Sequence, residues 1–123
     1  MNDIKILLVE DDDPSRTITE IFLKKTHNVI AVSNAIEAIE ITKNRKFDVI
    51  LMDINLGIGM SGLDAVKEIK KLPGYKNTPV IAATAFAMHG DKEEFLQAGC
   101  THYLAKPYNK EELFHIVKEA INS

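Results

Sequence analysis

Five short apolar runs rich in β-branched residues alternate with segments of helical period, and this alternation constrains the fold of the 123-residue chain more than any other feature. The runs cover residues 4–9, 29–32, 49–52, 79–83 and 103–104. Continuous apolar runs suit strands that are covered on both faces, as the strands of parallel sheets are. The pattern therefore predicts five β-strands, each followed by a helix, in one sheet that is mostly parallel.

Side chains typical of helix N-termini predict where the helices begin. Asp13 before Pro14 predicts an N-cap and a first helical residue, in a helix that runs to about Lys25. Its apolar residues at helical spacing are expected to face the sheet: Ile18, Ile21 and Phe22. Three further helices are predicted where an acid follows a capping side chain by three residues, at Asn34 with Glu37, Ser61 with Asp64 and Asn109 with Glu112.

Segment 91–98 is the weakest of the five predicted helices. Its apolar residues are Phe95, Leu96 and Ala98, and we expect Phe95 and Leu96 in the core. Gly99 is the expected C-terminal cap. Because so few apolar residues anchor this helix, it is expected to be the most mobile of the five.

Five parallel strands with right-handed crossovers and helices on both faces form a doubly wound α/β sheet. The most economical strand order is 2-1-3-4-5, a flavodoxin-like arrangement, and the length fits one domain over residues 1–123. In this order the chain reverses direction across the sheet between the first and third strands. The carboxyl ends of those two strands then open a crevice in which ligands bind.

Composition excludes several classes of protein. Lys and Arg total 15 against 18 for Asp and Glu, so the net charge of −3 gives no basic surplus for direct nucleic-acid binding. The longest apolar runs are far too short to span a membrane, and the start lacks a secretory signal, so a cytoplasmic protein is expected. Cys100, the single cysteine, is expected to be a small packed residue. The four histidines lack metal-ligand spacing and are expected at the surface: His27, His89, His102 and His115.

Carboxylates gather where two neighbouring strands end. The first strand is followed by Glu10, Asp11, Asp12 and Asp13, and the third ends in Asp53. At least three of these carboxylates should converge on one small volume, which favours a bound Mg²⁺, with Mn²⁺ as an expected substitute. Asp12 and Asp13 have the alternative role of capping the first helix and complementing its dipole.

A hydroxyl and an ammonium group lie on the same predicted rim. Thr84 ends the fourth strand and Lys106 follows the fifth, just before Pro107. Taken singly, neither residue is unusual. A metal, a carboxylate, an ammonium and a hydroxyl that face one another would form a site for a phosphoryl group.

Four motifs now point to a known family: Leu-Leu-Val-Glu-Asp-Asp, Ile-Leu-Met-Asp-Ile-Asn, Ala-Ala-Thr-Ala and Tyr-Leu-Ala-Lys-Pro, in order at the strand ends. Over essentially its whole length the chain resembles a two-component response regulator receiver domain. The resemblance implies that Asp53 accepts a phosphoryl group from a histidine kinase or phosphotransferase. It implies Asp11 as a direct Mg²⁺ ligand, Glu10 as a ligand through water, and the backbone carbonyl of Asn55 as a third ligand.

The same resemblance implies roles for three further residues. Lys106 would pair with the phosphoryl group, Thr84 would hydrogen-bond it, and Tyr103 would act as an aromatic switch. Phosphorylation would change the surface of the fourth helix, fifth strand and fifth helix for partner binding. The protein would be a self-catalysed phosphoacceptor with intrinsic autodephosphorylation and would not be a turnover enzyme. Segment 84–91 further resembles receivers of hybrid kinases and of single-domain cell-cycle regulators.

The loop after the third strand departs from the family pattern of Met-Pro-x-Met-Asp-Gly. Gly57 replaces the proline, Ser61 replaces the common aspartate, and the loop is one residue longer. The loop lies beside the expected metal and docking edge. The departures are therefore expected to affect partner choice and phosphoryl lifetime more than the chemistry.

Two alternatives from other classes start from the same residues. Gly57, Gly59 and Gly62 match a dinucleotide-binding fingerprint, although the acid expected about 20 residues further on is missing. A magnesium-dependent aspartyl-nucleophile phosphatase would need a general acid two residues after the nucleophile, where Asn55 stands. The receiver interpretation leads to a phosphorylation switch or phosphorelay intermediate.

The chain ends at Ser123, which leaves no room for an output domain and favours a stand-alone receiver whose output is protein contact. The expected partners are a histidine kinase or histidine phosphotransferase and a downstream effector protein. Neither nucleic acid nor a membrane is expected as a direct partner. The expected state is a monomer or a weak dimer.

Overall fold

The chain folds around a single five-stranded parallel sheet, seen in a computed structural model that describes residues 4–56, 59–85 and 92–123. The strands are β1 (Lys5–Val9), β2 (Asn28–Val32), β3 (Val49–Asp53), β4 (Val80–Thr84) and β5 (His102–Ala105). Their order is β2-β1-β3-β4-β5, which confirms the predicted topology. Each apolar run of the sequence therefore forms a strand, shifted by at most a residue or two from its predicted limits.

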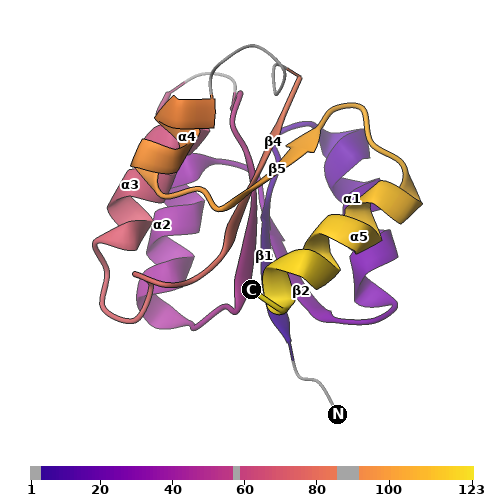
Figure 1. The fold of residues 1–123 in the computed structure, drawn as a ribbon, viewed down its shortest axis with the longest axis horizontal. Helices are drawn as coiled ribbons and strands as arrows, with labels where there is room; N and C mark the ends of the chain where they lie inside the picture. The colour runs from indigo at the N-terminus through magenta and orange to yellow at the C-terminus, as the bar shows by residue number, and fades with distance from the viewer. Residues whose placement is uncertain (1–3, 57–58, 86–91) are drawn as a thin grey trace.

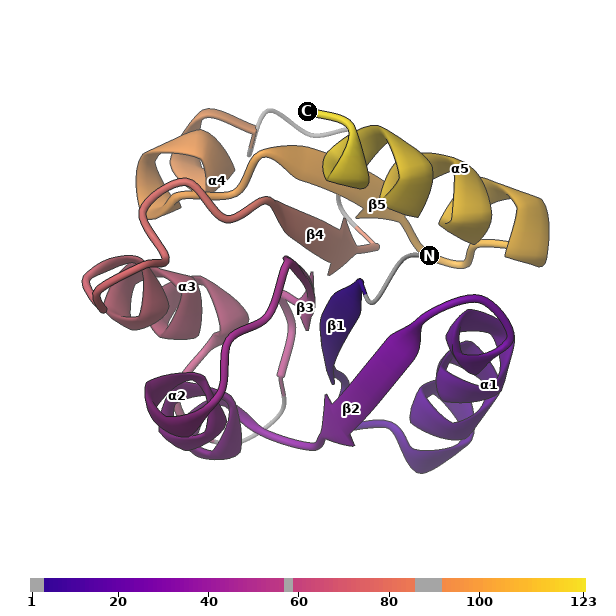
Figure 2. The same ribbon diagram turned by 90° about the horizontal axis from the view of Figure 1, so that it is seen from below.

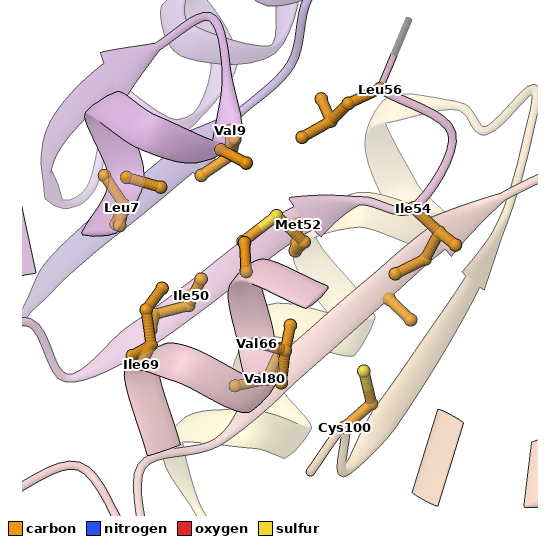
Figure 3. Close-up of a cluster of buried hydrophobic side chains, with 14 of the residues drawn as sticks. Leu7, Val9, Ile50, Met52, Ile54, Leu56, Val66, Ile69, Val80 and Cys100 are labelled. Carbon is orange, nitrogen blue, oxygen red and sulfur yellow. The ribbon is translucent and has the colours of Figure 1, made fainter. Parts of the chain in front are cut away.

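The helices cover both faces of the sheet. They are α1 (Asp13–Lys24), α2 (Ala35–Asn44), α3 (Gly62–Lys70), α4 (Lys92–Ala98) and α5 (Lys110–Ile121). Figure 2 shows α1 and α5 on one face and α2, α3 and α4 on the other. Because successive strand residues point to opposite faces, neighbours in the sequence enter different cores. Leu51 of β3 belongs to the core beside α1 and α5. Met52 belongs to the other core, beside α2 and α3, which Figure 3 shows.

Three of the predicted caps form as the sequence indicated. Asn34, Ser61 and Asn109 each accept a hydrogen bond from the backbone N–H three residues later. At Asn109 the backbone N–H also donates to Glu112 Oε1 at 3.0 Å, and this second hydrogen bond completes a capping box. These local bonds fix the positions at which α2, α3 and α5 begin.

The start of α1 differs from the prediction by one residue. Asp12, rather than Asp13, is the N-cap, because its carboxylate accepts a hydrogen bond from the Ser15 N–H at 3.0 Å. Asp13 is the first helical residue, and Pro14 occupies the second position. Proline is tolerated at either of the first two positions, because neither N–H has a partner within the helix.

The predicted apolar stripe of α1 is confirmed for Phe22, which is half-buried against the core, but is wrong for the two isoleucines. Ile18 and Ile21 are more than half exposed, and the buried residues of the helix are Thr19 and Leu23. The polar Thr19 is accepted inside because its hydroxyl hydrogen-bonds the Tyr108 hydroxyl at 2.9 Å. The helix is therefore rotated so that an isoleucine face remains open.

Helix α4 confirms part of its prediction. Phe95 is buried, but Leu96 is 59% exposed, because a seven-residue helix presents only one side to α3 and the sheet. Gly99 ends the helix as expected: its φ of +116° lies in the left-handed region, and its N–H bonds the Phe95 and Leu96 carbonyls. The predicted first residue, Asp91, lies outside the described residues.

Candidate functional site

Three carboxylates meet at the carboxyl ends of two neighbouring strands. Glu10 and Asp11 follow β1, and Asp53 is the last residue of β3. One ligand oxygen from each of these residues lies within 4.8 Å of the other two. Glu10 and Asp53 are buried and Asp11 is exposed, so the cluster opens to solvent on one side. The predicted convergence of carboxylates is confirmed for these three.

Asp12 and Asp13 serve the helix instead. The two hydrogen bonds that Asp12 makes with Ser15 hold the pKa of its carboxyl below the ordinary value. The Asp13 carboxylate pairs with the Arg16 guanidinium within the first turn of α1. The alternative role that the sequence left open for these two acids, at the N-terminus of the helix, is therefore the one that forms.

Lys106 brings its ammonium group into the acid cluster from the end of β5. Its Nζ atom lies 2.8 Å from Glu10 Oε1 and 3.4 Å from Asp53 Oδ2. Burial opposes the charge of this lysine, but the hydrogen bond to Glu10 and the attraction of Asp53 leave its pKa raised. The group therefore remains a cation and lies beside both buried carboxylates.

Asp53 has the most perturbed carboxyl at the site. Burial, together with the neighbouring Glu10 carboxyl, raises the pKa of Asp53 to about 7, although Lys106 and a hydrogen bond from the Asn55 N–H oppose the shift. The single positive charge of Lys106 thus cannot neutralise two buried carboxylates and a third, exposed one. A divalent cation with hard oxygen ligands fits such a cluster, because it would relieve the mutual repulsion of the carboxylates.

Thr84 and Tyr103 lie on the two strands beyond β3. Thr84 is the buried last residue of β4, one residue after Ala83, which pairs with Asp53 across the sheet. The Thr84 carbonyl accepts a hydrogen bond from the Lys106 backbone N–H at 2.9 Å. This backbone bond links the residue that carries the hydroxyl to the residue that carries the ammonium group. Tyr103 is half-buried on β5, and its ring centroid lies 5.9 Å from that of Phe95 in α4.

The structure also adds residues that the sequence interpretation did not assign to the site. Arg16 Nη1 donates to the Glu10 carbonyl at 3.0 Å and so ties α1 to the acid cluster. Gly62, the first residue of α3, lies so close to β3 that an added Cβ would be 2.2 Å from the Asp53 carbonyl oxygen. The glycine-rich loop was the signal for Gly62: this residue allows α3 to approach the strand that carries Asp53.

A shallow groove adjoins the site along α1. It measures about 430 Å³ and reaches Glu10 and Lys106 at one end. Its apolar lining comes from Ile18 and Phe22 of α1 and from Tyr108 after β5. Of the two exposed isoleucines of α1, Ile18 lines this groove, so an apolar surface adjoins the edge of the acid cluster.

The fold and the site together define a class of signalling protein: a doubly wound α/β domain that carries an acid cluster and a lysine at its carboxyl edge. The sequence matches the family described as the response regulator receiver domain over residues 6–118. The chain belongs to this family. Within the described residues, no helix has the length and apolar character needed to cross a membrane.

Similar proteins of known sequence include both short and long chains. The polar-differentiation response regulator DivK of Brucella anthropi is 33% identical over 114 residues, which cover 92% of each chain. Two histidine kinases are longer: signal transduction histidine-protein kinase BarA of Escherichia coli K12 is 38% identical, and hybrid signal transduction histidine kinase G of Dictyostelium discoideum is 36% identical. These matches cover 90% and 94% of this chain but only 12% and 3% of the two kinases.

Solved structures show the same fold at nearly full coverage. The receiver domain of sensor histidine kinase PA1611 from Pseudomonas aeruginosa PAO1 has a TM-score of 0.89 and 37% identity, over 99% of this chain and 100% of that one. That crystal structure has a magnesium ion coordinated in its active site cleft. The chemotaxis protein CheY4 of Vibrio cholerae has a TM-score of 0.92 and 28% identity, over 97% and 99% of the chains.

Proposed function

We propose that Asp53 is the phosphoacceptor of this receiver domain and takes its phosphoryl group from the phosphohistidine of a histidine kinase or histidine phosphotransferase. The observation that carries the proposal is the position of its buried carboxylate, 3.4 Å from Lys106 Nζ and within the acid cluster. An Asp53 oxygen attacks phosphorus, the N–P bond of phosphohistidine breaks, and the imidazole nitrogen leaves with the electron pair. Lys106 balances negative charge on the transferred oxygens.

Mg²⁺ would be held by the carboxylates of Glu10, Asp11 and Asp53 and by the backbone carbonyl of Asn55. We expect Asp11, the exposed member of the cluster, to be a direct ligand and Glu10 to act through water, with Mn²⁺ as a substitute metal. When bound, the ion supplies positive charge to the phosphoryl oxygens. The raised pKa of Asp53 supports this assignment, because a site that holds too much negative charge for one lysine favours a divalent cation.

After transfer, the new group carries about two negative charges and three acceptor oxygens. We infer that the Thr84 hydroxyl donates to one of those oxygens and that Lys106 turns from Glu10 toward another. Movement of Thr84 would leave space beside β5 for Tyr103. The Tyr103 ring contacts Phe95 of α4, so its movement would change the surface formed by α4, β5 and α5, where we place effector binding.

The face of α1 is the proposed docking surface for the phosphodonor. Exposed Ile18 and Ile21 are costly to leave in water unless a partner covers them. The adjoining groove leads from Ile18 to Lys106, so a helix docked there would bring its histidine to the edge of the acid cluster. The α1 surface and the effector surface lie on different elements, which allows the two kinds of partner to be distinguished by mutation.

The two alternative functions lose support beside this one. A phosphatase of the aspartyl-nucleophile class needs a proton donor two residues after the nucleophile, and the amide of Asn55 cannot protonate a leaving group. In the dinucleotide interpretation Gly57 lies outside the described residues, whereas Gly62 packs against the backbone of Asp53. Family membership favours the receiver function over both.

Intact-mass measurement with acetyl phosphate tests the proposal. We expect a covalent phosphoryl adduct on the wild type with Mg²⁺, little adduct with EDTA, and none on Asp53→Asn. Asp48→Asn provides a matched control, because Asp48 is an exposed aspartate outside the acid cluster. Full labelling of Asp53→Asn, or equal labelling with and without metal, would contradict the assignment.

A further inference from the structure

A second cavity lies at the edge formed by the amino ends of the strands. The acid cluster lies at the opposite edge, formed by their carboxyl ends. The cavity measures about 610 Å³ and lies between the end of α1, the start of β2 and the segment that leads into β3. Figure 1 shows the amino ends of β1 and β2 together at this edge. The lining residues are Lys5, Lys24, His27, Asn28, Val29, Ile30, Arg45, Lys46 and Phe47.

The lining of this cavity is basic although the protein as a whole is acidic. Among the described residues, four lysines or arginines from three separate segments line the cavity, and no aspartate or glutamate does. Lys24 pairs with Glu20 at 2.9 Å. Lys5 and Arg45 form no ion pair among the described residues. The nearest acid along the chain, Asp48, accepts the backbone N–H of Lys5 at 2.9 Å and lines a neighbouring hollow.

Lys46 is a cation held in place without a carboxylate partner in the part of the chain that the structure describes. Its Nζ atom donates to the Gly74 carbonyl and to the Thr78 hydroxyl, and it lies 4.4 Å from the centroid of the Tyr75 ring. The Tyr75 hydroxyl in turn donates to the Arg45 carbonyl at 2.6 Å. These contacts hold in place the segment that carries both Arg45 and Lys46. Less conformational entropy is therefore lost when an anion binds to it.

The wall beside the cations is the open edge of the sheet, where the backbone groups of β2 that face away from β1 have no neighbouring strand among the described residues. Strand β2 is at the edge of the sheet, and its Asn28 N–H bonds the Ile4 carbonyl of the β1 side. In a parallel strand alternate residues face opposite sides, so the N–H and C=O groups of Val29 face away from β1. Val29 and Ile30 pack their side chains into opposite cores, so the cavity wall at this point is the backbone edge of β2, which can hydrogen-bond the edge of a nucleobase.

We propose that this cavity binds a small anion with adjacent phosphate groups, and that a nucleoside diphosphate is the ligand it fits best. Arg45 and Lys5 supply positive charge that no ion pair within the described ranges neutralises, and a guanidinium binds phosphate oxygens in pairs. The β2 wall faces the nucleoside. The volume lies in the range of small-molecule sites. The cavity is separate from the acid cluster and from the glycine-rich loop.

Calorimetric titration with three probes in EDTA tests the proposal: ADP, inorganic pyrophosphate and adenosine. We expect ADP to bind with a dissociation constant below about 1 mM. Arg45→Gln and Lys5→Gln should each weaken binding roughly tenfold. Both side chains are exposed, so the variants are expected to fold. Lys67→Gln, which removes an exposed charge from α3 outside the cavity, should change affinity by less than about twofold.

The comparison of probes identifies the part of the ligand that is recognised. Tighter binding of ADP than of pyrophosphate, with no binding of adenosine, supports a nucleotide site. Equal affinities for ADP and pyrophosphate retain the phosphate site and assign it to inorganic anions. Absence of ADP and pyrophosphate binding, or an equal loss in Lys67→Gln, overturns the proposal. Binding of a short DNA oligonucleotide through Arg45 when ADP does not bind also overturns it and assigns the cations to nucleic acid.

Discussion

At the scale of single residues, Asp53 holds a carboxylate where burial and Glu10 both oppose its ionisation. The proposed chemistry requires Asp53 at the end of β3. In this position the pKa of its carboxyl is raised to about 7 from the usual 3.8. A carboxyl whose pKa is raised on folding is protonated more readily in the folded than in the unfolded chain. Its contribution therefore makes the folded state less stable as the pH rises between those two values.

We predict that Asp53→Asn stabilises the metal-free protein above pH 7. The difference in the free energy of unfolding between variant and wild type should be near zero below about pH 4. It should grow through the interval to about pH 7 and reach roughly 1 to 3 kcal/mol. Urea unfolding in EDTA across this pH range measures it, and added Mg²⁺ should narrow the difference. A difference that is constant with pH would show that Asp53 ionises normally.

A second residue-scale prediction separates the acids that hold metal from those that cap α1. Asp11→Ala should weaken Mg²⁺ binding roughly tenfold or more, because it removes a carboxylate of the cluster. Asp13→Ala is the matched control, since Asp13 pairs with Arg16 in the first turn of α1. Titration of Mg²⁺ followed by NMR of the backbone amides measures both. A larger loss of Mg²⁺ affinity from Asp13→Ala than from Asp11→Ala would contradict the placement of the metal at the acid cluster.

At the scale of elements, α4 is the shortest helix of the described chain, and its Phe95 ring contacts Tyr103 of β5. A change in charge near Thr84 can reach α4 through β4 and β5, because Thr84 pairs with Ala105 and its carbonyl bonds Lys106. A short helix anchored by few buried side chains is easier to displace than the strands beneath it. Local charge can therefore shift α4 without unfolding the sheet.

We predict that a beryllofluoride mimic of the phosphoryl group changes amide exchange over residues 92–104, and that the change depends on the Thr84 hydroxyl. Exchange measured by mass spectrometry should respond in the wild type and in Thr84→Ser but much less in Thr84→Ala. The serine variant controls for the loss of the methyl group, because it keeps the donor. Equal changes in the serine and alanine variants would refute coupling through the hydroxyl.

At the scale of the whole molecule, β3 joins the two cores into one unit. All five of its residues are buried, and its four apolar residues, 49–52, alternate between the core beside α1 and α5 and the core beside α2, α3 and α4. A cavity on either face therefore weakens the same sheet. The apolar residues left outside these cores, such as Leu96, contribute little to its stability.

We predict that Leu51→Ala lowers the free energy of unfolding by roughly 2 to 5 kcal/mol in a single cooperative transition. Leu96→Ala removes the same atoms from an exposed site and should change it by no more than about 0.5 kcal/mol. Chemical denaturation followed by circular dichroism measures both. Similar losses in the two variants would mean that Leu96 is covered in solution, for instance by a partner copy.

Sequence alone determined the elements and their order, because the signals for them are local. Apolar runs and capping side chains act over a few residues, so the strands and the starts of α2, α3 and α5 could be predicted almost to the residue. The strand order then placed Glu10, Asp11 and Asp53 at one edge, since parallel strands end together. The roles assigned to the site residues all stay predictions: Glu10, Asp11, Asp53, Asn55, Thr84, Tyr103 and Lys106.

Only the tertiary structure decided how the elements face one another. The apolar pattern of α1 could not show that Thr19 would turn inward to meet Tyr108, 89 residues away, and leave Ile18 and Ile21 exposed. The contact between Lys106 and Glu10 and the basic cavity around Arg45 likewise join segments far apart in the chain. Such contacts depend on distances across the folded sheet, and the local signals in a sequence contain no measure of those distances.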